Sequence, residues 1–341
     1  MQGNGRARAH TNIALIKYWG KRDEALFLPM NSSLSLTLDA FYTDTKVIFS
    51  DAFTADHFVL NGHEQPPEET VKISRFLDLF RKEEGISTKA CVESYNHVPT
   101  AAGLASSASG FAALALATHE SLGLDKTMEE LSTYARRGSG SSSRSLFGGF
   151  VEWDKGTNAL DSYAHFIDSA DWDVGMVILV LDAGSKKTPS RVGMLHTVAT
   201  SPFYKTWVET AADDLEVMRE AIFQKDLETV GKIAEHNAMK MHATTLSSNP
   251  SFTYWSDKTI LAQEVVREIR DRTGLLAYMT MDAGPNVKVL CRQSEMIELA
   301  RLLELALPFA HIITSQVGPG ASVLSEEEWQ TALLEVEKPC K

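Results

Sequence analysis

The sequence has few cysteines and no segment suited to export or membrane insertion. Its three cysteines are far apart and form no C-x-x-C pair, which argues against a disulfide framework and a zinc knuckle. The apolar run that begins at Ile13 is broken by Lys17 and is too short for a secretory signal. The longest later run, 174–181, has only the length of a strand. We therefore expect a cytoplasmic protein with reduced thiols.

Positive charge is also scarce. The chain has 33 lysines and arginines against 45 aspartates and glutamates, a net charge of −12. A nucleic acid or an anionic membrane would need a basic face, so we expect neither as a partner. A ligand that carries phosphates would need basic residues gathered locally against this overall charge.

The usual nucleotide-binding and hydrolase signatures are missing as well. The chain has no G-x-x-x-x-G-K-[ST], G-x-G-x-x-G, H-E-x-x-H or G-x-S-x-G. His236 and His242 are six residues apart in a predicted helix, on poorly matched faces for a shared metal ion. We interpret them as core or surface histidines.

What the sequence does contain is a serine-rich stretch, 99–117 (PTAAGLASSASGFAALALA). Gly103 provides a flexible entry, and Ser106, Ser107 and Ser109 stand where an Ala/Leu-rich helix is predicted to begin. The unpaired N–H groups and partial positive charge of a helix start favour an anion. A turn that merely caps a buried helix is the alternative, but three hydroxyls exceed what a cap needs and favour a phosphate site.

A second stretch, 138–149 (GSGSSSRSLFGG), is also rich in glycine and serine. Such runs are often flexible linkers. This one lies between apolar segments and has Arg144 in its middle. We favour a second anion-binding loop.

The hydrophobic pattern predicts an α+β protein in two halves. Strands are expected at 11–21, 33–38, 45–50, 90–95, 174–181, 275–281, 287–290 and 310–315, and helices at 69–84, from 128 to 138, and at 204–223, 227–241, 259–272, 294–307 and 326–337. The polar, basic loop 185–191 is the predicted hinge between an N-terminal domain, 1–184, and a C-terminal domain, 185–341. We expect the active site in the cleft between them.

One acidic residue stands out among the polar groups at the ends of these elements. Asp282 follows an apolar strand and precedes Ala-Gly, where a partly desolvated base would be close to a substrate. The alternative is an Asx turn that begins the Gly-Pro bend.

Four stretches together carry a resemblance to a known family. They are 12–21 (NIALIKYWGK), 99–110 (PTAAGLASSASG), 139–144 (SGSSSR) and 281–288 (MDAGPNVK). In this order they resemble the diphosphomevalonate decarboxylases of the GHMP kinase superfamily, over about residues 11–320. The serine-rich stretch is typical of the whole superfamily, whereas the first and last stretches are specific to the decarboxylases.

The resemblance implies a two-domain GHMP kinase-like fold, a homodimer, and a reaction that uses ATP and Mg²⁺. Mevalonate 5-diphosphate would be converted to isopentenyl diphosphate, CO₂, ADP and phosphate. The tertiary 3-hydroxyl group is a poor leaving group, so it would first be phosphorylated. Departure of that phosphate would then accept the electrons released as the carboxylate leaves.

The resemblance also implies a role for each matching residue. Asp282 would orient or deprotonate the 3-hydroxyl group, Arg144 would hold the substrate carboxylate or Asp282, and Lys17 would stabilise developing negative charge. The substrate diphosphate would be held by Tyr18, Lys21, Ser139, Ser141 and Ser190. ATP would be bound by Ala101, Gly103, Leu104, Ala105, Ser106, Ser107 and Lys187, with Mg²⁺ at Ser106 and Ser107 and the base beside Lys72 and Ser94.

The loop 186–194 matches the family least well. Arg191 stands where a small hydroxyl residue is expected, and this leaves the role of Ser190 open. The basic, polar loop is also a candidate lid over ATP.

Two other functions compete with the decarboxylase. A GHMP-family kinase that phosphorylates mevalonate or phosphomevalonate without decarboxylation would share the fold and the ATP site. An inactive ligand-binding protein on the same scaffold is the second alternative. Asp282 and the Lys-Tyr-Trp-Gly-Lys start favour the decarboxylase over a kinase, and the presence of both Asp282 and Arg144 argues against an inactive protein.

Overall fold

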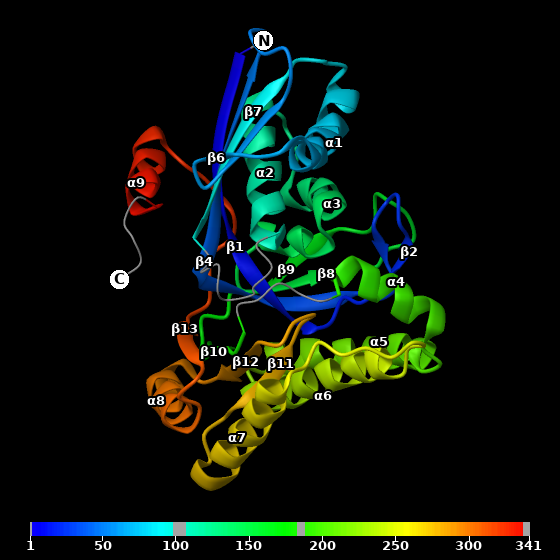
Figure 1. Ribbon diagram of the computed structural model, residues 1–341, viewed down its shortest axis with the longest axis vertical. Coiled ribbons are helices and arrows are strands. Elements are labelled where there is room, and N and C mark those ends of the chain that lie inside the picture. Colours follow the sequence, from blue (N-terminus) through cyan, green and yellow to red (C-terminus); the bar gives the residue numbers. More distant parts are fainter. Residues whose placement is uncertain (1, 98–106, 183–187, 337–341) are drawn as a thin grey trace.

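The computed structural model describes residues 2–97, 107–182 and 188–336, which form two sheets with helices around them (Figure 1). The larger sheet has the strand order β14-β1-β4-β7-β5-β6, and β8 joins β4 to β9. Its strands are β1 (Gln2–Ile16), β4 (Ser33–Ser50), β5 (His57–Leu60), β6 (His63–Glu64), β7 (Ala90–His97), β8 (Phe150–Trp153), β9 (Ala164–Asp168) and β14 (Ser322–Val323). All pairings in it are antiparallel except β5 with β7.

The smaller sheet is antiparallel and has the order β11-β12-β10-β13. Its strands are β10 (Gly175–Val180), β11 (Tyr278–Met281), β12 (Val287–Cys291) and β13 (His311–Ser315). A separate hairpin of β2 (Lys21–Asp23) and β3 (Leu28–Pro29) follows β1. The chain therefore reaches the smaller sheet through β10 before it forms the helices of its second half.

Helices pack against the faces of both sheets. Those beside the larger sheet are α1 (Pro67–Glu84), α2 (Ser107–Leu122), α3 (Met128–Gly138) and α9 (Glu326–Val336), with the short 3₁₀ helix η2 (Gly140–Leu146) after α3. The second half contributes α4 (Ser190–Thr200), α5 (Tyr204–Phe223), α6 (Leu227–Leu246), α7 (Asp257–Thr273), the 3₁₀ helix η3 (Gln293–Glu295) and α8 (Met296–Ala306). Figure 1 shows α9 on the side of the larger sheet opposite α2.

Three apolar clusters hold these layers together. One joins α1, α2 and α3 to the larger sheet, where Ala7 and Phe49 are buried. Another joins the smaller sheet to α7 and α8. The third lies between the sheets: Leu15 and Leu36 of the larger sheet pack with Ile178 of the smaller sheet and with α5 and α6. Because this core is shared, the ends of strands from both sheets are fixed relative to one another.

Most predicted elements are present close to their expected bounds. The helix at 204–223 and the capping box of Thr127 and Glu130 are confirmed, with Glu130 N donating to Thr127 Oγ1 and Thr127 N to the Glu130 carboxylate. Two strand predictions were wrong. The strands expected at 33–38 and 45–50 are one strand, β4, and the strand expected at 11–21 is the last part of β1, which already ends at Ile16. Most of the stretch 138–149 forms the buried helix η2, which excludes the flexible linker that was the alternative to an anion-binding loop.

The predicted division of the chain at residues 184 and 185 stays a prediction. Strand pairing places β10 with the smaller sheet and β14 with the larger one. We propose that each unit contributes one strand to the sheet of the other: β10, from before the boundary, to the smaller sheet, and β14, from after it, to the larger sheet. Among the residues that the structure describes, no helix is both long and apolar enough to cross a membrane.

Close packing of β1 on α2 yields a prediction about stability. A Cβ added at Gly5 would lie 2.1 Å from the backbone oxygen of Ala117, so one of the two elements would have to move. We expect Gly5→Ala to lower the free energy of unfolding by about 1–3 kcal/mol. Gly110, inside α2, has open space around it, and Gly110→Ala is expected to raise that free energy by up to about 1 kcal/mol. Urea denaturation of both variants measures this difference in sign, and equal midpoints would contradict it.

Candidate active site

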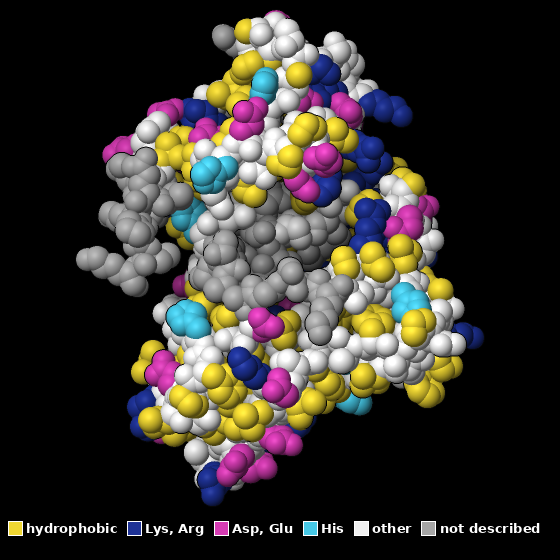
Figure 2. Space-filling model, viewed as in Figure 1, with side chains coloured by type: hydrophobic (Ala, Val, Ile, Leu, Met, Phe, Trp, Pro, Cys, Tyr) yellow, Lys and Arg dark blue, Asp and Glu magenta, His cyan; other side chains and the backbone are white. Residues whose placement is uncertain are grey.

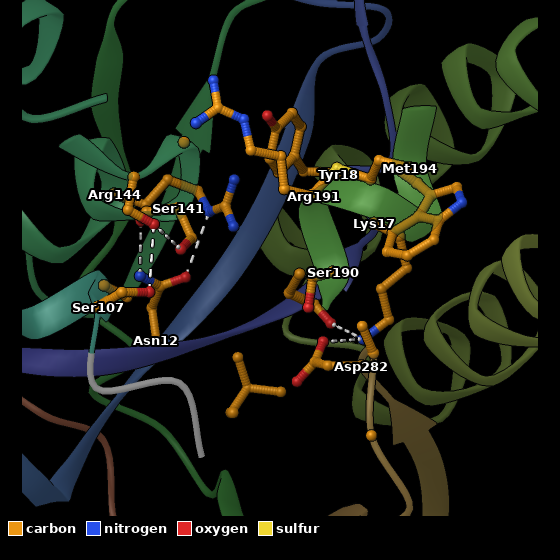
Figure 3. Close-up of a pocket in the computed structure, with 18 of the residues that line it drawn as sticks. Asn12, Lys17, Tyr18, Ser107, Ser141, Arg144, Ser190, Arg191, Met194 and Asp282 are labelled. Atoms are coloured by element: carbon orange, nitrogen blue, oxygen red, sulfur yellow. Dashed lines mark hydrogen bonds and ion pairs between the residues drawn. The ribbon is translucent and has the colours of Figure 1, made fainter. Parts of the chain in front are cut away.

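A cavity of about 310 Å³ opens where strands of both sheets end beside η2 and α4. Lys17 follows β1, Asp282 follows β11, and Ser107 begins α2. Figure 3 shows Lys17 and Asp282 on one side of this cavity and Asn12, Ser141 and Arg144 on the other. The residues come from distant parts of the sequence, and the shared core brings them together.

The Asp282 carboxylate is bound by two lysines. Lys17 Nζ lies 2.7 Å from Asp282 Oδ1, and Lys288 Nζ lies 3.3 Å from Asp282 Oδ2. Both lysine side chains are 3% exposed, whereas that of Asp282 is 38% exposed. Burial alone would raise the pKa of the Asp282 carboxyl, but the two ammonium groups hold that pKa well below its usual range. Asp282 is therefore an anion that faces the cavity.

Lys17 is fixed by contacts at both ends of the residue. Its backbone N donates to Asn237 Oδ1 on α6 at 2.8 Å, and Nζ donates to the backbone oxygen of Ala14 at 2.8 Å. Asn237 in turn donates to Asp214 Oδ2 on α5 at 2.7 Å. Burial lowers the pKa of Lys17 to about 8, against the opposing attraction of Asp282. Lys17 is thus a rigid cation that is more easily deprotonated than an ordinary lysine.

The turn after β11 does not depend on the Asp282 side chain. Gly284 N donates to the backbone oxygen of Asp282 at 2.7 Å, while the carboxylate oxygens contact the lysines. Asn286 Oδ1 accepts hydrogen bonds from the backbone N of Leu181 at 2.8 Å and of Asp182 at 3.1 Å, which ties the turn to the end of β10. These contacts are not those of the Asx turn considered from sequence, because the Asp282 carboxylate contacts the two lysines.

Arg144 is a buried cation whose partners among the described residues are hydroxyl and amide oxygens. It is 1% exposed, and its guanidinium donates to Ser33 Oγ at 2.5 Å, Ser35 Oγ at 2.9 Å and Asn12 Oδ1 at 3.4 Å. No carboxylate in the described part of the chain is within ion-pair distance of it. Burial lowers the pKa of Arg144 to about 10, so it stays charged at neutral pH. A buried, unpaired guanidinium beside a cavity calls for an anionic ligand.

Tyr18 presents a hydroxyl group that is buried and finds no hydrogen-bond partner among the described residues. Its ring packs against Trp153, with centroids 4.9 Å apart. Burial raises the pKa of Tyr18 far above its usual value, so the hydroxyl remains a donor. A Cβ at Gly140 would lie 2.6 Å from the Tyr18 ring, which explains a glycine at the start of η2.

The remaining polar groups surround the same cavity. Ser107 Oγ and Ser141 Oγ lie 3.3 and 3.4 Å from Ser139 Oγ. At the rim, Glu24 Oε2 accepts from Lys21 Nζ at 3.1 Å and from Arg191 at 3.4 Å. Ser190 begins α4 and also lines the cavity.

The cavity collects basic side chains although the chain is acidic overall. On the face in Figure 2, basic and acidic side chains are interspersed and form no patch of one sign. The described cavity lining, in contrast, has Asp282 as its acidic residue and the basic residues Lys17, Lys21, Arg144, Arg191 and Lys288. The local excess of cations that a phosphate ligand requires is present.

The structure thus brings most of the predicted residues that it describes to one place. The cavity is lined by Lys17, Tyr18, Lys21, Ser107, Ser139, Ser141, Arg144, Ser190 and Asp282. Lys72 and Ser94 do not line it: Lys72 is exposed on α1 and pairs with Glu69, and Ser94 is buried on β7 against Thr45. The predictions for Ala101, Gly103, Leu104, Ala105, Ser106 and Lys187 fall outside the described residues.

Sequence reasoning gave no role to several residues of the lining, among them Asn12 and Lys288. Asn12 donates to Ser145 Oγ at 2.7 Å and contacts Arg144. Lys288 had a recognisable signal, because it is a charged residue inside an apolar strand, 287–291 (VKVLC).

His242 is buried against Trp255, with ring centroids 4.8 Å apart, and no group of three or more metal-binding side chains exists in the described regions.

Comparison with known proteins identifies relatives along almost the whole chain. Residues 9–164 match the diphosphomevalonate decarboxylase-like N-terminal domain, and residues 176–337 match the mevalonate 5-diphosphate decarboxylase C-terminal domain. The diphosphomevalonate decarboxylase of Rattus norvegicus is 36% identical, over 95% of this chain and 86% of that protein. That of Saccharomyces cerevisiae is 41% identical, over 82% of this chain and 75% of that protein.

Solved structures agree with these sequence relatives. The mevalonate diphosphate decarboxylase of Staphylococcus aureus is 46% identical and aligns with a TM-score of 0.91, over 95% of this chain and 99% of that chain. A structure described as "MDDEF in complex with MVAPP, AMPPCP and Magnesium" is also 46% identical, with a TM-score of 0.90 over 95% of this chain and all of that chain. The two-domain α+β fold expected from sequence is confirmed.

The excess of cations predicts that a small polyanion stabilises the protein. We expect inorganic pyrophosphate to raise the melting temperature, because a ligand at 100 times its Kd adds about 2.7 kcal/mol to the stability of the folded state. Lys21→Met should lose most of this shift, since the Lys21 side chain is 5% exposed and lines the cavity. Lys205→Met, at an 88% exposed side chain of α5, is the matched control and should keep the shift. Equal shifts in the two variants, measured by thermal denaturation, would contradict the prediction.

Proposed function

The chain belongs to the diphosphomevalonate decarboxylase family, and we propose that its cavity converts mevalonate 5-diphosphate and ATP to isopentenyl diphosphate, CO₂, ADP and phosphate. The observation that carries this proposal is the Asp282 carboxylate between Lys17 and Lys288, in one cavity with the unpaired Arg144. The substrate has a carboxylate, a diphosphate and a hydroxyl group. The cavity offers a buried cation, a group of hydroxyls and lysines, and an anionic acceptor to match them.

The order of the chemical steps follows from the substrate. Its tertiary hydroxyl oxygen attacks the γ-phosphorus of ATP, the bond from that phosphorus to the bridging oxygen breaks, and ADP leaves with the electron pair. The hydroxyl proton would pass to Asp282, and the oxygen becomes part of a phosphate ester, which is a far better leaving group. The carbon–oxygen bond of that ester then breaks, and phosphate departs with its electron pair. The bond between the carboxyl carbon and its neighbour breaks in turn, CO₂ leaves, and this electron pair forms the new double bond.

Asp282 would accept the hydrogen bond of the hydroxyl group and orient its oxygen. Because the two lysines stabilise the ionised form, Asp282 is a weak base that rarely takes a proton before the reaction starts. Phosphoryl transfer passes through a loose transition state, so the charge on the attacking oxygen changes late. A weak but well-placed acceptor is sufficient for a proton that leaves late.

Arg144 and Lys17 would manage the negative charges of the substrate. The planar guanidinium of Arg144 suits a carboxylate, and its contacts with serine and asparagine oxygens leave its charge uncompensated. Lys17, held by Ala14 and Asn237, would stabilise charge that develops near the hydroxyl group. The diphosphate would lie against Tyr18, Lys21, Ser139, Ser141 and Ser190.

The nucleotide would approach from the start of α2. The residues proposed for it are Ser107, Ala101, Gly103, Leu104, Ala105, Ser106 and Lys187, with Lys72 and Ser94 proposed beside the base. Mg²⁺ that accompanies a nucleotide keeps several waters and needs few protein oxygens. The hydroxyl group of Ser107, in the lining of the cavity, is such an oxygen, and with Ser106 it would hold the ion that neutralises phosphate charge. The family resemblance also supports a homodimer, and the net charge of −12 argues against nucleic-acid and anionic-membrane partners. We propose a cytoplasmic homodimer without such partners.

The decisive assay counts two products separately. With Mg-ATP and mevalonate 5-diphosphate, we expect equal amounts of ADP and CO₂, and we expect Asp282→Asn to lower both rates by about 10²–10⁴-fold. Asp271→Asn makes the same change at an exposed position of α7 and should leave both rates unchanged. ADP without CO₂ would instead identify a kinase that stops at the phosphorylated intermediate. Absence of both products would favour the alternative considered from sequence, an inactive ligand-binding protein on the same scaffold.

A further inference from the structure

Lys288 occupies an unusual place for a lysine, the interior of the smaller sheet. It lies on β12, between β11 and β10, opposite Thr280 and Ile178. Its neighbours Val287 and Val289 are buried in the core with α7 and α8. Side chains alternate along a strand, so Lys288 points the other way, toward the cavity that it lines. A buried ammonium at this position is unfavourable unless it is paired.

The one charged partner of Lys288 among the described residues is the Asp282 carboxylate. Its Nζ lies 3.3 Å from Asp282 Oδ2 and 3.4 Å from the backbone oxygen of Asn286, which are its partners within the described structure. The other carboxylate oxygen, Oδ1, is bound by Lys17 from the end of β1. Each oxygen of Asp282 is thus held by a lysine from a different sheet.

We propose that Lys288 is a positioning residue for the reaction: it fixes the plane of the Asp282 carboxylate, so that one oxygen edge meets the substrate hydroxyl group. The torsion that turns a carboxylate has broad minima, and a single contact does not select one orientation. Two lysines on two oxygens do select it. This inference rests on the proposed function, because it assigns Lys288 to the orientation of the attacking hydroxyl group.

The charged and titratable groups around Asp282 determine what loss of Lys288 does. Lys17 faces Asp282 from β1, Arg144 from η2, and His242 from α6. His242 is neutral at the pH of the assay, since burial lowers its pKa to about 3. Removal of the Lys288 charge raises the pKa of Asp282, because one of the two ammonium groups that favour the anion is gone. Asp282 is then protonated at a higher pH than in the unaltered protein.

The test compares Lys288→Met and Lys288→Arg in the whole protein, with Mg-ATP and mevalonate 5-diphosphate. We expect Lys288→Met to lower kcat by about 10- to 100-fold, the effect of a misplaced reacting group, and to change KM of the diphosphate substrate less than about threefold. The acidic limb of its pH–rate profile should move to higher pH. Lys288→Arg keeps the charge and changes the geometry, so its acidic limb should stay in place while kcat falls. Lys232→Met, at a 61% exposed side chain of α6, is the control and should resemble the unaltered protein.

The other outcomes overturn the inference. An unchanged kcat and acidic limb in Lys288→Met, with a lowered melting temperature, would make Lys288 a structural counter-ion. A raised KM with kcat retained would make it a substrate ligand. If Lys288→Met does not fold, a Lys288→Arg variant with unchanged kcat contradicts the proposal by itself. Failure of the unaltered protein to release CO₂ would instead overturn the proposed function, and the two failures are therefore distinguishable.

Discussion

The site depends on one interaction, the binding of the Asp282 carboxylate by two buried lysines. Lys17 comes from the larger sheet, whereas Asp282 and Lys288 come from the smaller one. The two buried ammonium groups would be unfavourable without the carboxylate, and they in turn favour its ionised form. The apolar cluster between the sheets keeps the three groups in register. Packing and electrostatics therefore support each other at the place where the strands end.

The same arrangement explains how an acidic protein accommodates an acidic substrate. The net charge of −12 is distributed over the whole chain, while the cavity gathers cations around a single carboxylate. Arg144 has hydroxyl and amide partners in place of an acid, and Tyr18 keeps an unpartnered hydroxyl group among the described residues. Buried polar groups in a folded core normally have their hydrogen-bond and charge partners within the protein. Here a bound ligand would supply the missing partners, which is the physical reason to regard these groups as functional.

The sequence predicted much of the fold because local patterns determine local elements. The helix at 204–223 has its apolar residues on one face, and Thr127 with Glu130 forms the capping box that its spacing indicates. It also predicted Lys17, Arg144 and Asp282 as members of one site, since each stands at the end of an element in a stretch typical of the family. The prediction failed where distant pairing decides the structure. The first part of β4 pairs with β8, its second part pairs with β7, and β1 pairs with both parts, so the two predicted strands are one. β14 returns to β1 from the far end of the chain. Asn237 was missed for a related reason, because its partner Lys17 is remote in sequence. Lys288 is close to Asp282 in sequence, but the two side chains meet only because β11 and β12 pair across the turn between them.

The ionisation of Asp282 is the most direct measure of this account. Carbon-13 NMR of the carboxyl groups, with aspartate labelled and Asp282→Asn used for assignment, follows that titration in the ligand-free protein. We expect the Asp282 signal to stay that of a carboxylate below the pH at which ordinary aspartates, with pKa values of about 3.9, take up a proton. A midpoint at or above that value would contradict it, because the carboxylate would then not be held by the two lysines.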